Sequence, residues 1–596
     1  MEKVVLLADI SVEEKILGQK KIVISEEQIN TNPTNLTETL RYNSPIVFRD
    51  YGNGGVSSAR FRGTSATNTA VFWNGLNINA VGSGQVDFNA IGANTSDAIV
   101  VTSGGSSTQD GSGAIGGSVS LNDELKFKKH QNTQLFSSYG SFNTLSSYAK
   151  TNISTGKLAF KIGGSYNVSD NDYEFLDPHY KDENGNSLKN ENGFYENYNL
   201  SLAVGYKINT ENKIYLYTSR YKGERQYSDG LPNPKAGDEK NLDFNQRNLV
   251  KWENSYLGFK SQLKLAYLFQ EYRYFPSISS EIYSFGKSDE YISSLETIKR
   301  INPYLKVGGR IQYQYIDGGT AKIEEVRTVF SNVLDMYINP IKNLNVNLSV
   351  RNENNSDFEL PLIYSTSLKY ILKKWRINTS YSTNFRAPTF NELYWPGFGN
   401  SALLPETTKQ YEIGLNYKSN DVNFSINYFD ISFKNKIEWI PSGGSNTWKP
   451  SNLESVSNYG FEFYGYIQKS LGKHTLSLKG NYINVSAVNN SIQKVLRYVP
   501  RHMTNYKINY NYNLISIYLQ GLYQSKVYTT EDNIDFYSID LVNVKNIGVK
   551  VHLLKKKDEE LVLGFVVNNI ENSLYYFSNL RPMPGRNFNA NINYKF

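Results

Sequence analysis

The side chains best suited to catalysis or metal binding are few and scattered in this chain. Cysteine is absent, which excludes disulfides and thiolate metal sites. The five histidines form no HExxH motif or other close ligand pair, and no Ser/His/Asp constellation is localised. They are His130, His179, His474, His502 and His552. We therefore expect no enzymatic activity and no bound cofactor.

Two other stretches carry residue types that bind phosphate or cations. The glycine-rich run 113–117 lacks a following Gly-Lys-Ser/Thr and a βαβ context, which argues against a phosphate loop. The polar stretch 169–194 contains Asp170, Asp172, Asp182 and Glu183. Residues 182–186 loosely resemble a calcium loop, but the glutamate at its twelfth position is missing. We expect a solvated loop, with calcium as the alternative.

Composition excludes several classes of protein. The chain has 596 residues, of which 39% are hydrophobic, and its mean hydropathy is -0.49. No stretch approaches the ~20 apolar residues of a spanning helix. The net charge of +7 comes from 63 basic and 56 acidic residues, a near balance that gives no concentrated basic surface for nucleic acid.

The last residues alternate with the period of a β-strand. Phe588, Ala590, Ile592, Tyr594 and Phe596 share one face, and four asparagines and a lysine share the other. One face therefore suits hydrocarbon and the other water. A chain ending in this way, with an aromatic last residue, resembles bacterial outer-membrane β-barrels, which would place the protein among outer-membrane lipids.

The same alternation recurs from Lys126 onward, for example in 158–168, 476–482 and 515–523. Some gaps between runs are short, whereas four are long and polar: 169–194, 223–247, 436–457 and 526–536. Short turns on one side and long loops on the other are typical of an outer-membrane barrel. About 22 antiparallel strands fit the length, and a lumen that wide needs a plug.

A composition change near residue 123 divides the chain. We predict an N-terminal periplasmic segment over 1–20, an α+β plug domain over 21–123 and a transmembrane β-barrel over 124–596. Within the plug, capping groups and the spacing of its leucines predict a helix from Asn35 to about Tyr42. The N-terminus lacks the apolar region of a signal peptide, so we interpret the sequence as a mature chain.

Several motifs carry a family resemblance that spans nearly the whole chain. Arg62-Gly63, the strand and Asn-Gly turn of 69–78, and the glycine-rich segment 111–121 resemble the plug of TonB-dependent outer-membrane transporters. The barrel segments 384–394, 458–462 and 584–588 are similar to the same family. The resemblance implies active import energised by the partner protein TonB, and it implies no enzyme.

The resemblance also implies roles for individual residues. Plug arginines of the family pair with barrel glutamates, so we expect ion pairs among Arg62, Arg60, Glu392, Glu406, Glu412 and Glu462. Segment 98–105 lacks the Glu and Arg of many family plugs, so a second plug arginine would have to be Arg60 or Arg49. The TonB box, a short strand captured by TonB, would contain Val4, Val5, Leu6 and Leu7.

The form of 61–88, with Trp-Asn-Gly at 73–75, is closest to cobalamin receptors of Bacteroidetes type. Cobalamin or a related corrinoid is therefore the expected ligand. The alternatives are a ferric siderophore, whose receptors favour an aromatic and arginine-rich crater, and a glycan or peptide imported with a surface lipoprotein. The residues expected to bind the ligand are Tyr51, Asn53, Asn79, Val81, Ser83, Gln85, Tyr394 and Trp395.

Overall fold

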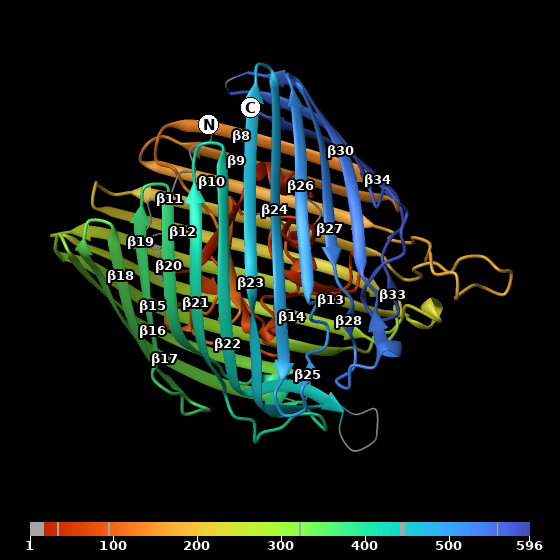
Figure 1. The fold of residues 1–596 in the computed structure, drawn as a ribbon, viewed down its shortest axis with the longest axis horizontal. Coiled ribbons are helices and arrows are strands. Elements are labelled where there is room, and N and C mark those ends of the chain that lie inside the picture. Colours follow the sequence, from red (N-terminus) through yellow and green to blue (C-terminus); the bar gives the residue numbers. More distant parts are fainter. Residues whose placement is uncertain are drawn as a thin grey trace.

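The computed structural model describes residues 17–32, 35–92, 94, 96–320, 323–441, 448–556 and 558–596, and the structural statements below refer to these residues. They form a strand barrel with a small mixed domain, the plug, inside it (Figure 1). In this part of the chain no helix is long and apolar enough to cross a membrane. The predicted TonB box at 4–7 lies outside the described residues.

The barrel wall is one closed antiparallel sheet. Each strand pairs with its neighbour in the chain, and β34 pairs back to β8. Among the described residues, 22 strands close the wall, and the two-residue strand β25 (Lys494–Val495) lies beside β24. This architecture, with a plug inside, confirms the predicted fold class. The wall strands are β8 (His130–Gly140), β9 (Thr144–Ser154), β10 (Leu158–Ser169), β11 (Tyr195–Lys207), β12 (Asn212–Tyr227), β13 (Glu239–Tyr256), β14 (Phe259–Phe275), β15 (Ser284–Asn302), β16 (Leu305–Thr320), β17 (Ile323–Ile341), β18 (Leu344–Asn355), β19 (Ile363–Leu372), β20 (Trp375–Arg386), β21 (Glu406–Lys418), β22 (Val422–Pro441), β23 (Trp448–Leu471), β24 (His474–Asn489), β26 (His502–Tyr512), β27 (Ile515–Gln524), β30 (Val542–Lys555), β31 (Glu560–Asn568) and β34 (Asn587–Lys595).

Side chains alternate between the outer face of the wall and the lumen. In β34, Phe588 and Ile592 are exposed on the outer face, as the terminal alternation predicts. Leucines and isoleucines of other strands are similarly exposed, which suits contact with lipid. The lumen is partly apolar, because Ile115 of the plug is buried against wall residues such as Phe429 and Val485.

In its described residues, the plug combines a five-stranded sheet, a two-stranded hairpin, three short α-helices and two 3-10 helices. Its sheet has the order β1-β6-β7-β4-β5, in which β4 and β7 run parallel. The predicted helix is present as α2, and the Asn35 side chain accepts a hydrogen bond of 2.9 Å from the Glu38 N–H at its start. The plug elements are β1 (Lys20–Ile24), α1 (Glu26–Ile29), α2 (Leu36–Arg41), β2 (Val47–Asp50), β3 (Ser57–Arg60), β4 (Thr69–Trp73), β5 (Leu76–Asn77), β6 (Ala98–Ser103), α3 (Ser107–Asp110) and β7 (Gly117–Asn122).

The two ends of the barrel differ in the length of their connections. One end has short turns such as 257–258, and the other has long loops at 170–194, 387–405, 525–541 and 569–586. Two predicted loops were wrong in extent. Strands β12 and β13 shorten the expected loop 223–247 to 228–238, and β22 and β23 pair as far as Pro441 and Trp448. The polar residues at the ends of these four strands are part of the sheet, because the strands extend beyond the membrane into water.

The long loops contain a fourth α-helix and four short strands. Helix α4 (Phe390–Tyr394) lies in loop 387–405, and its N-cap Thr389 forms a capping box with Glu392. The short strands are β28 (Val527–Tyr528), β29 (Ser538–Ile539), β32 (Tyr576–Ser578) and β33 (Arg581–Pro582). Of these short strands, β32 contacts both β2 of the plug and β29.

Candidate functional site

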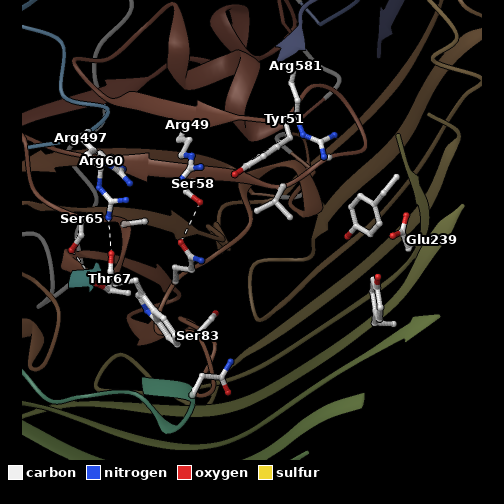
Figure 2. Close-up of a pocket in the computed structure, with 18 of the residues that line it drawn as sticks. Arg49, Tyr51, Ser58, Arg60, Ser65, Thr67, Ser83, Glu239, Arg497 and Arg581 are labelled. Carbon is white, nitrogen blue, oxygen red and sulfur yellow. Dashed lines mark hydrogen bonds between the residues drawn. The ribbon is translucent and has the colours of Figure 1, made fainter. Parts of the chain in front are cut away.

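A cavity of about 710 Å³, the crater cavity, lies between the plug and the long loops (Figure 2). Plug residues from Arg49 to Thr67, together with Ser83 and Gln85, form one side of it. The rest of the lining comes from the ends of β12 to β14, β22 and β33, from the loop containing α4, from the loop 170–194 and from the loop between β24 and β26. Aromatic rings alternate with amides, hydroxyls and charged groups, which suits a large ligand with both apolar and polar surface.

Five of the eight residues predicted to bind the ligand line this cavity, and they come from the plug and from the loop of α4. They are Tyr51, Asn53, Ser83, Gln85 and Trp395. Val81 lines a second cavity of about 290 Å³, the side cavity, between the plug loop 78–91 and the wall strands β12 to β17. Ser83, Gln85 and Asn391 border both cavities, so the plug loop and α4 together separate them.

The remaining two predicted residues line neither cavity. The Asn79 side chain accepts a hydrogen bond from the Val71 N–H at 2.8 Å and donates to the carbonyls of Thr69 and Gly84 at 2.8 and 3.0 Å. These hydrogen bonds connect the loop 78–91 to strand β4 of the plug. Tyr394 packs against the apolar cluster that includes Leu393.

Helix α4 is tied to the wall by a buried arginine. Arg386 donates to Glu392 at 2.8 and 3.1 Å and to Glu406 at 2.7 Å. Glu406 also accepts from the Asn68 amide of the plug at 2.7 Å. The predicted plug–barrel pairs of Glu392 and Glu406 are thus replaced by pairs to a barrel arginine, because the Arg-Ala-Pro segment places that guanidinium nearer than any plug arginine.

The predicted pairs of Arg62 are formed across the plug–wall interface. Its Nε and Nη2 donate to Glu462 at 2.9 and 3.1 Å, and Nη1 lies 3.0 Å from Glu412. The guanidinium also lies over the Phe429 ring at 4.5 Å. Burial alone would lower the pKa of Arg62, but the two carboxylates outweigh it and raise the pKa above its ordinary value.

Backbone geometry brings the second carboxylate to Arg62. Gly104, at the end of the segment in which the family's extra Glu and Arg are missing, has a φ of +100°. A Cβ at this position would collide with Oε1 of Glu412. Glycine therefore leaves the space into which the glutamate reaches.

Arg60, the other predicted ion-pairing arginine, has a different environment. It donates to the backbone carbonyl of Arg497 at 3.2 Å, and its Nε is buried without a hydrogen-bond partner. Burial and the neighbouring Arg49 and Arg497 together lower its pKa to about 10, although Glu438 opposes them. Its predicted pairing with Glu392, Glu406, Glu412 or Glu462 is not formed in the described structure.

Sequence reasoning missed several crater residues from the loops and from the strand ends beside them, among them Arg497, Arg581, Trp439 and Tyr274. A signal for the two arginines exists. Each is followed within three residues by proline, in Arg-Tyr-Val-Pro and Arg-Pro-Met-Pro. Proline marks a segment leaving the regular sheet, so these arginines belong to the loop end of the barrel.

Other charged pairs attach the plug to the opposite part of the wall. Lys161 of β10 is bonded to Asp97 at 2.8 Å and to Asp123, and Arg225 of β12 is bonded to Asp87. Burial would raise the pKa of Asp97, but Lys161 and Lys150 outweigh it and lower the pKa. The plug is thus held by ion pairs at several positions around the lumen.

The loop considered for calcium contains an ordinary polar turn. Asp182 accepts hydrogen bonds from the N–H groups of Asn184 and Asn186 at 2.9 and 2.7 Å. Among the residues with described coordinates, no group of three His, Cys, Asp or Glu side chains is arranged to hold a metal ion. Calcium at this loop stays a prediction.

Comparison with known families gives two matches. A family model described as "TonB-dependent Receptor Plug Domain" matches residues 15–118, and one described as "TonB dependent receptor-like, beta-barrel" matches residues 164–570. Together the two matches include the plug and most of the barrel wall.

Among curated proteins, the chain is similar to several named "Vitamin B12 transporter BtuB". The protein from Photobacterium profundum is 24% identical over 93% of this chain and 91% of its own length. The protein from Vibrio cholerae is 23% identical over 97% of this chain and 93% of its own length.

Solved structures resemble the fold over the full length. The FrpB iron transporter from Neisseria meningitidis has a TM-score of 0.81 at 14% identity and covers 98% of this chain and 100% of its own. The siderophore receptor PirA from Acinetobacter baumannii has a TM-score of 0.79 at 15% identity and covers 98% and 99%. At these identities the likeness concerns the arrangement of plug and barrel.

Proposed function

The chain belongs to the TonB-dependent receptors of the outer membrane, and we propose that the ligand it imports is cobalamin or a related corrinoid. The observation that carries this proposal is the similarity, over more than nine-tenths of both chains, to proteins named vitamin B12 transporters. The family consists of receptors and transporters that work with TonB, and import of a ligand does not require the protein to make or break covalent bonds.

The crater cavity supports a ligand of this kind. Tyr51, Trp395 and Trp439 offer flat apolar surfaces, and Trp395 and Trp439 meet edge to face at 6.3 Å. Asn53, Ser83 and Gln85 from the plug offer amide and hydroxyl groups. A corrin ring edged with amides presents complementary apolar and hydrogen-bonding surface.

Import requires the plug to rearrange, because it fills the lumen below the crater cavity. We propose that TonB engages a segment ahead of β1, with Val4, Val5, Leu6 and Leu7 as its box. Pulling on β1 would act directly on the region of Arg62, since the Lys20 side chain of β1 is buried beside Arg62 and Glu462. The ion pairs of Arg62 would therefore be among the first plug–wall contacts to bear the pulling force.

A ferric siderophore is the second candidate. Four arginines line the crater cavity together with aromatic rings, and this combination suits an anionic iron chelate. An importer of glycans or peptides working with a surface lipoprotein is the third candidate.

Binding measurements on the purified, detergent-solubilised chain test the proposal. Cyanocobalamin should bind with nanomolar affinity by calorimetry, and ferric siderophores should bind at least a hundredfold more weakly. Trp395→Ala should weaken cyanocobalamin binding about tenfold or more, because a large aromatic contact is lost. The control Trp252→Ala removes an exposed tryptophan of β13 that lies outside the crater. Binding of a siderophore instead of cyanocobalamin would refute the corrinoid proposal and leave the receptor family unchanged.

A further inference from the structure

Three arginines gather on one side of the crater cavity, and we call them the arginine wall: Arg49 and Arg60 from the plug hairpin, and Arg497 from the loop between β24 and β26 (Figure 2). The Arg60 guanidinium donates to the Arg497 carbonyl, and Arg49 is near enough to lower the pKa of Arg60. Like charges are thus held together at the base of an open cavity, which costs free energy unless an anion joins them.

Arg49 is stacked between two aromatic rings. Its guanidinium lies 4.1 Å from the centre of the Tyr498 ring and 5.5 Å from that of Tyr51. Its Nε is buried without a hydrogen-bond partner, and within the described chain no carboxylate forms an ion pair with it. Stacking fixes the plane of the guanidinium while leaving its terminal nitrogens available, so little conformational entropy is lost when an anion binds.

The carboxylates near the arginine wall are too few to neutralise it. Glu438 is already bonded to Lys436, and Glu531 approaches Arg497 only to 3.9 Å. Among the described residues, Glu438 and Glu531 are thus the carboxylates that interact with the arginine wall, and Lys436 competes for Glu438. The structural arginines of this protein differ, because Arg62 and Arg386 each contact two carboxylates within 3.1 Å.

We infer that the arginine wall is a subsite for an anionic oxygen group on the imported ligand. This inference rests on the proposed function, and for a corrinoid the group is the phosphodiester that joins the nucleotide to the corrin ring. The planar, doubly donating guanidinium matches the oxygens of a phosphate or carboxylate. Corrin ring and phosphodiester would then bind to different parts of the cavity, the ring to the tryptophans and the anion to the arginines.

The experiment compares two corrinoids on the solubilised full chain. Cyanocobalamin carries the phosphodiester, and dicyanocobinamide has the same corrin ring without it. Arg60→Gln and Arg49→Gln should each weaken cyanocobalamin binding about tenfold to about a hundredfold, and should leave dicyanocobinamide binding within about twofold. Arg60→Lys should recover part of the loss, because lysine restores the positive charge but lacks the two parallel N–H donors of a guanidinium. Thermal unfolding of each variant verifies that it is folded.

A charge-matched control excludes a general electrostatic effect. Arg273→Gln removes an exposed arginine that pairs with Glu271 and lines neither cavity. It should leave the binding of both corrinoids unchanged. An equal loss of both corrinoids in Arg60→Gln, or no loss of either, would overturn the inference.

A third probe separates this inference from the proposed function. Ferric citrate is an anionic chelate without a corrin ring. If the unmodified chain binds ferric citrate but neither corrinoid, and Arg60→Gln weakens that binding, the corrinoid proposal fails and the anion subsite stands. If the unmodified chain binds both corrinoids equally tightly, corrinoid import stands and the anion subsite is overturned.

Discussion

Arg60 and Arg62 are two residues apart in the plug and differ in almost every contact. Arg62 is fully buried, with Glu462 and Glu412 bonded to its guanidinium. Arg60 lines an open cavity, donates to one carbonyl and has two arginines, Arg49 and Arg497, as well as Glu438 as charged neighbours. Two arginines separated by one residue therefore have different environments, one paired with carboxylates and one facing the cavity.

The contrast shows how to separate attachment from recognition in this lumen. A cation whose charge is matched by carboxylates contributes to the seating of the plug, and its removal leaves those carboxylates buried and unpaired. A cation held by rings and carbonyls lacks this role, and its removal relieves repulsion. Stability and ligand affinity should therefore respond to different arginines.

The largest effect on stability is expected for Arg62→Ala. Glu412 and Glu462 would remain buried without a counter-charge, which typically costs about 3–5 kcal/mol. The loss should appear as faster protease cleavage and hydrogen exchange in the plug, with the barrel strands unchanged. A variant whose plug is as protected as that of the parent chain would contradict the attachment role of Arg62.

Lys20 should give the plug a pH dependence. Burial lowers its pKa, Glu462 opposes this effect and Arg62 adds to it, and the resulting pKa is about 8. In the unfolded chain the pKa of Lys20 is about 10.5. Between pH 8 and pH 10.5 the folded side chain is therefore neutral and the unfolded one is charged, so unfolding takes up a proton. The plug consequently gains stability as the pH rises from about 8 to 10.5. The gain corresponds to about 3 kcal/mol at most.

Hydrogen exchange of β1 as a function of pH measures this gain. Lys20→Met should be more protected than the parent at pH 7, and its protection should no longer rise above pH 8. An identical pH profile in the two proteins would show that Lys20 keeps its proton in the folded plug.

Gly104→Ala should weaken the Arg62 site without removing any charge. The positive φ costs an alanine about 1–2 kcal/mol, and the new Cβ would displace Glu412. Plug protection should fall less than in Arg62→Ala, and Glu412→Gln should make Gly104→Ala less harmful because the shared interaction is already weakened. Additive losses in the double variant would argue against this coupling.

The smallest effect on stability is expected for Arg60→Gln. Plug protection should stay within about 0.5 kcal/mol of the parent value or increase slightly, because repulsion from Arg49 and Arg497 is relieved. Hydrogen exchange under the conditions used for Arg62→Ala gives the comparison. A loss as large as that of Arg62→Ala would make both arginines attachment residues.

Local sequence patterns were sufficient for much of the architecture. Alternation over 588–596 predicted an outward face, and Phe588 and Ile592 are exposed there. Asn35 and the following leucines predicted α2. Residues 436–441 and 448–457 were misread as parts of a loop, because polarity alone does not distinguish a loop from paired strands that extend into water.

The sequence by itself determined that this chain forms a plugged barrel, because a period of two residues and glycine-rich plug motifs are local properties. Only the tertiary structure decided which arginine meets which carboxylate. Arg62 and Glu462 are 400 residues apart, and the register of the wall strands and the seating of the plug bring them together. The same seating leaves Arg60 facing the crater cavity, a difference that neither residue type nor spacing encodes.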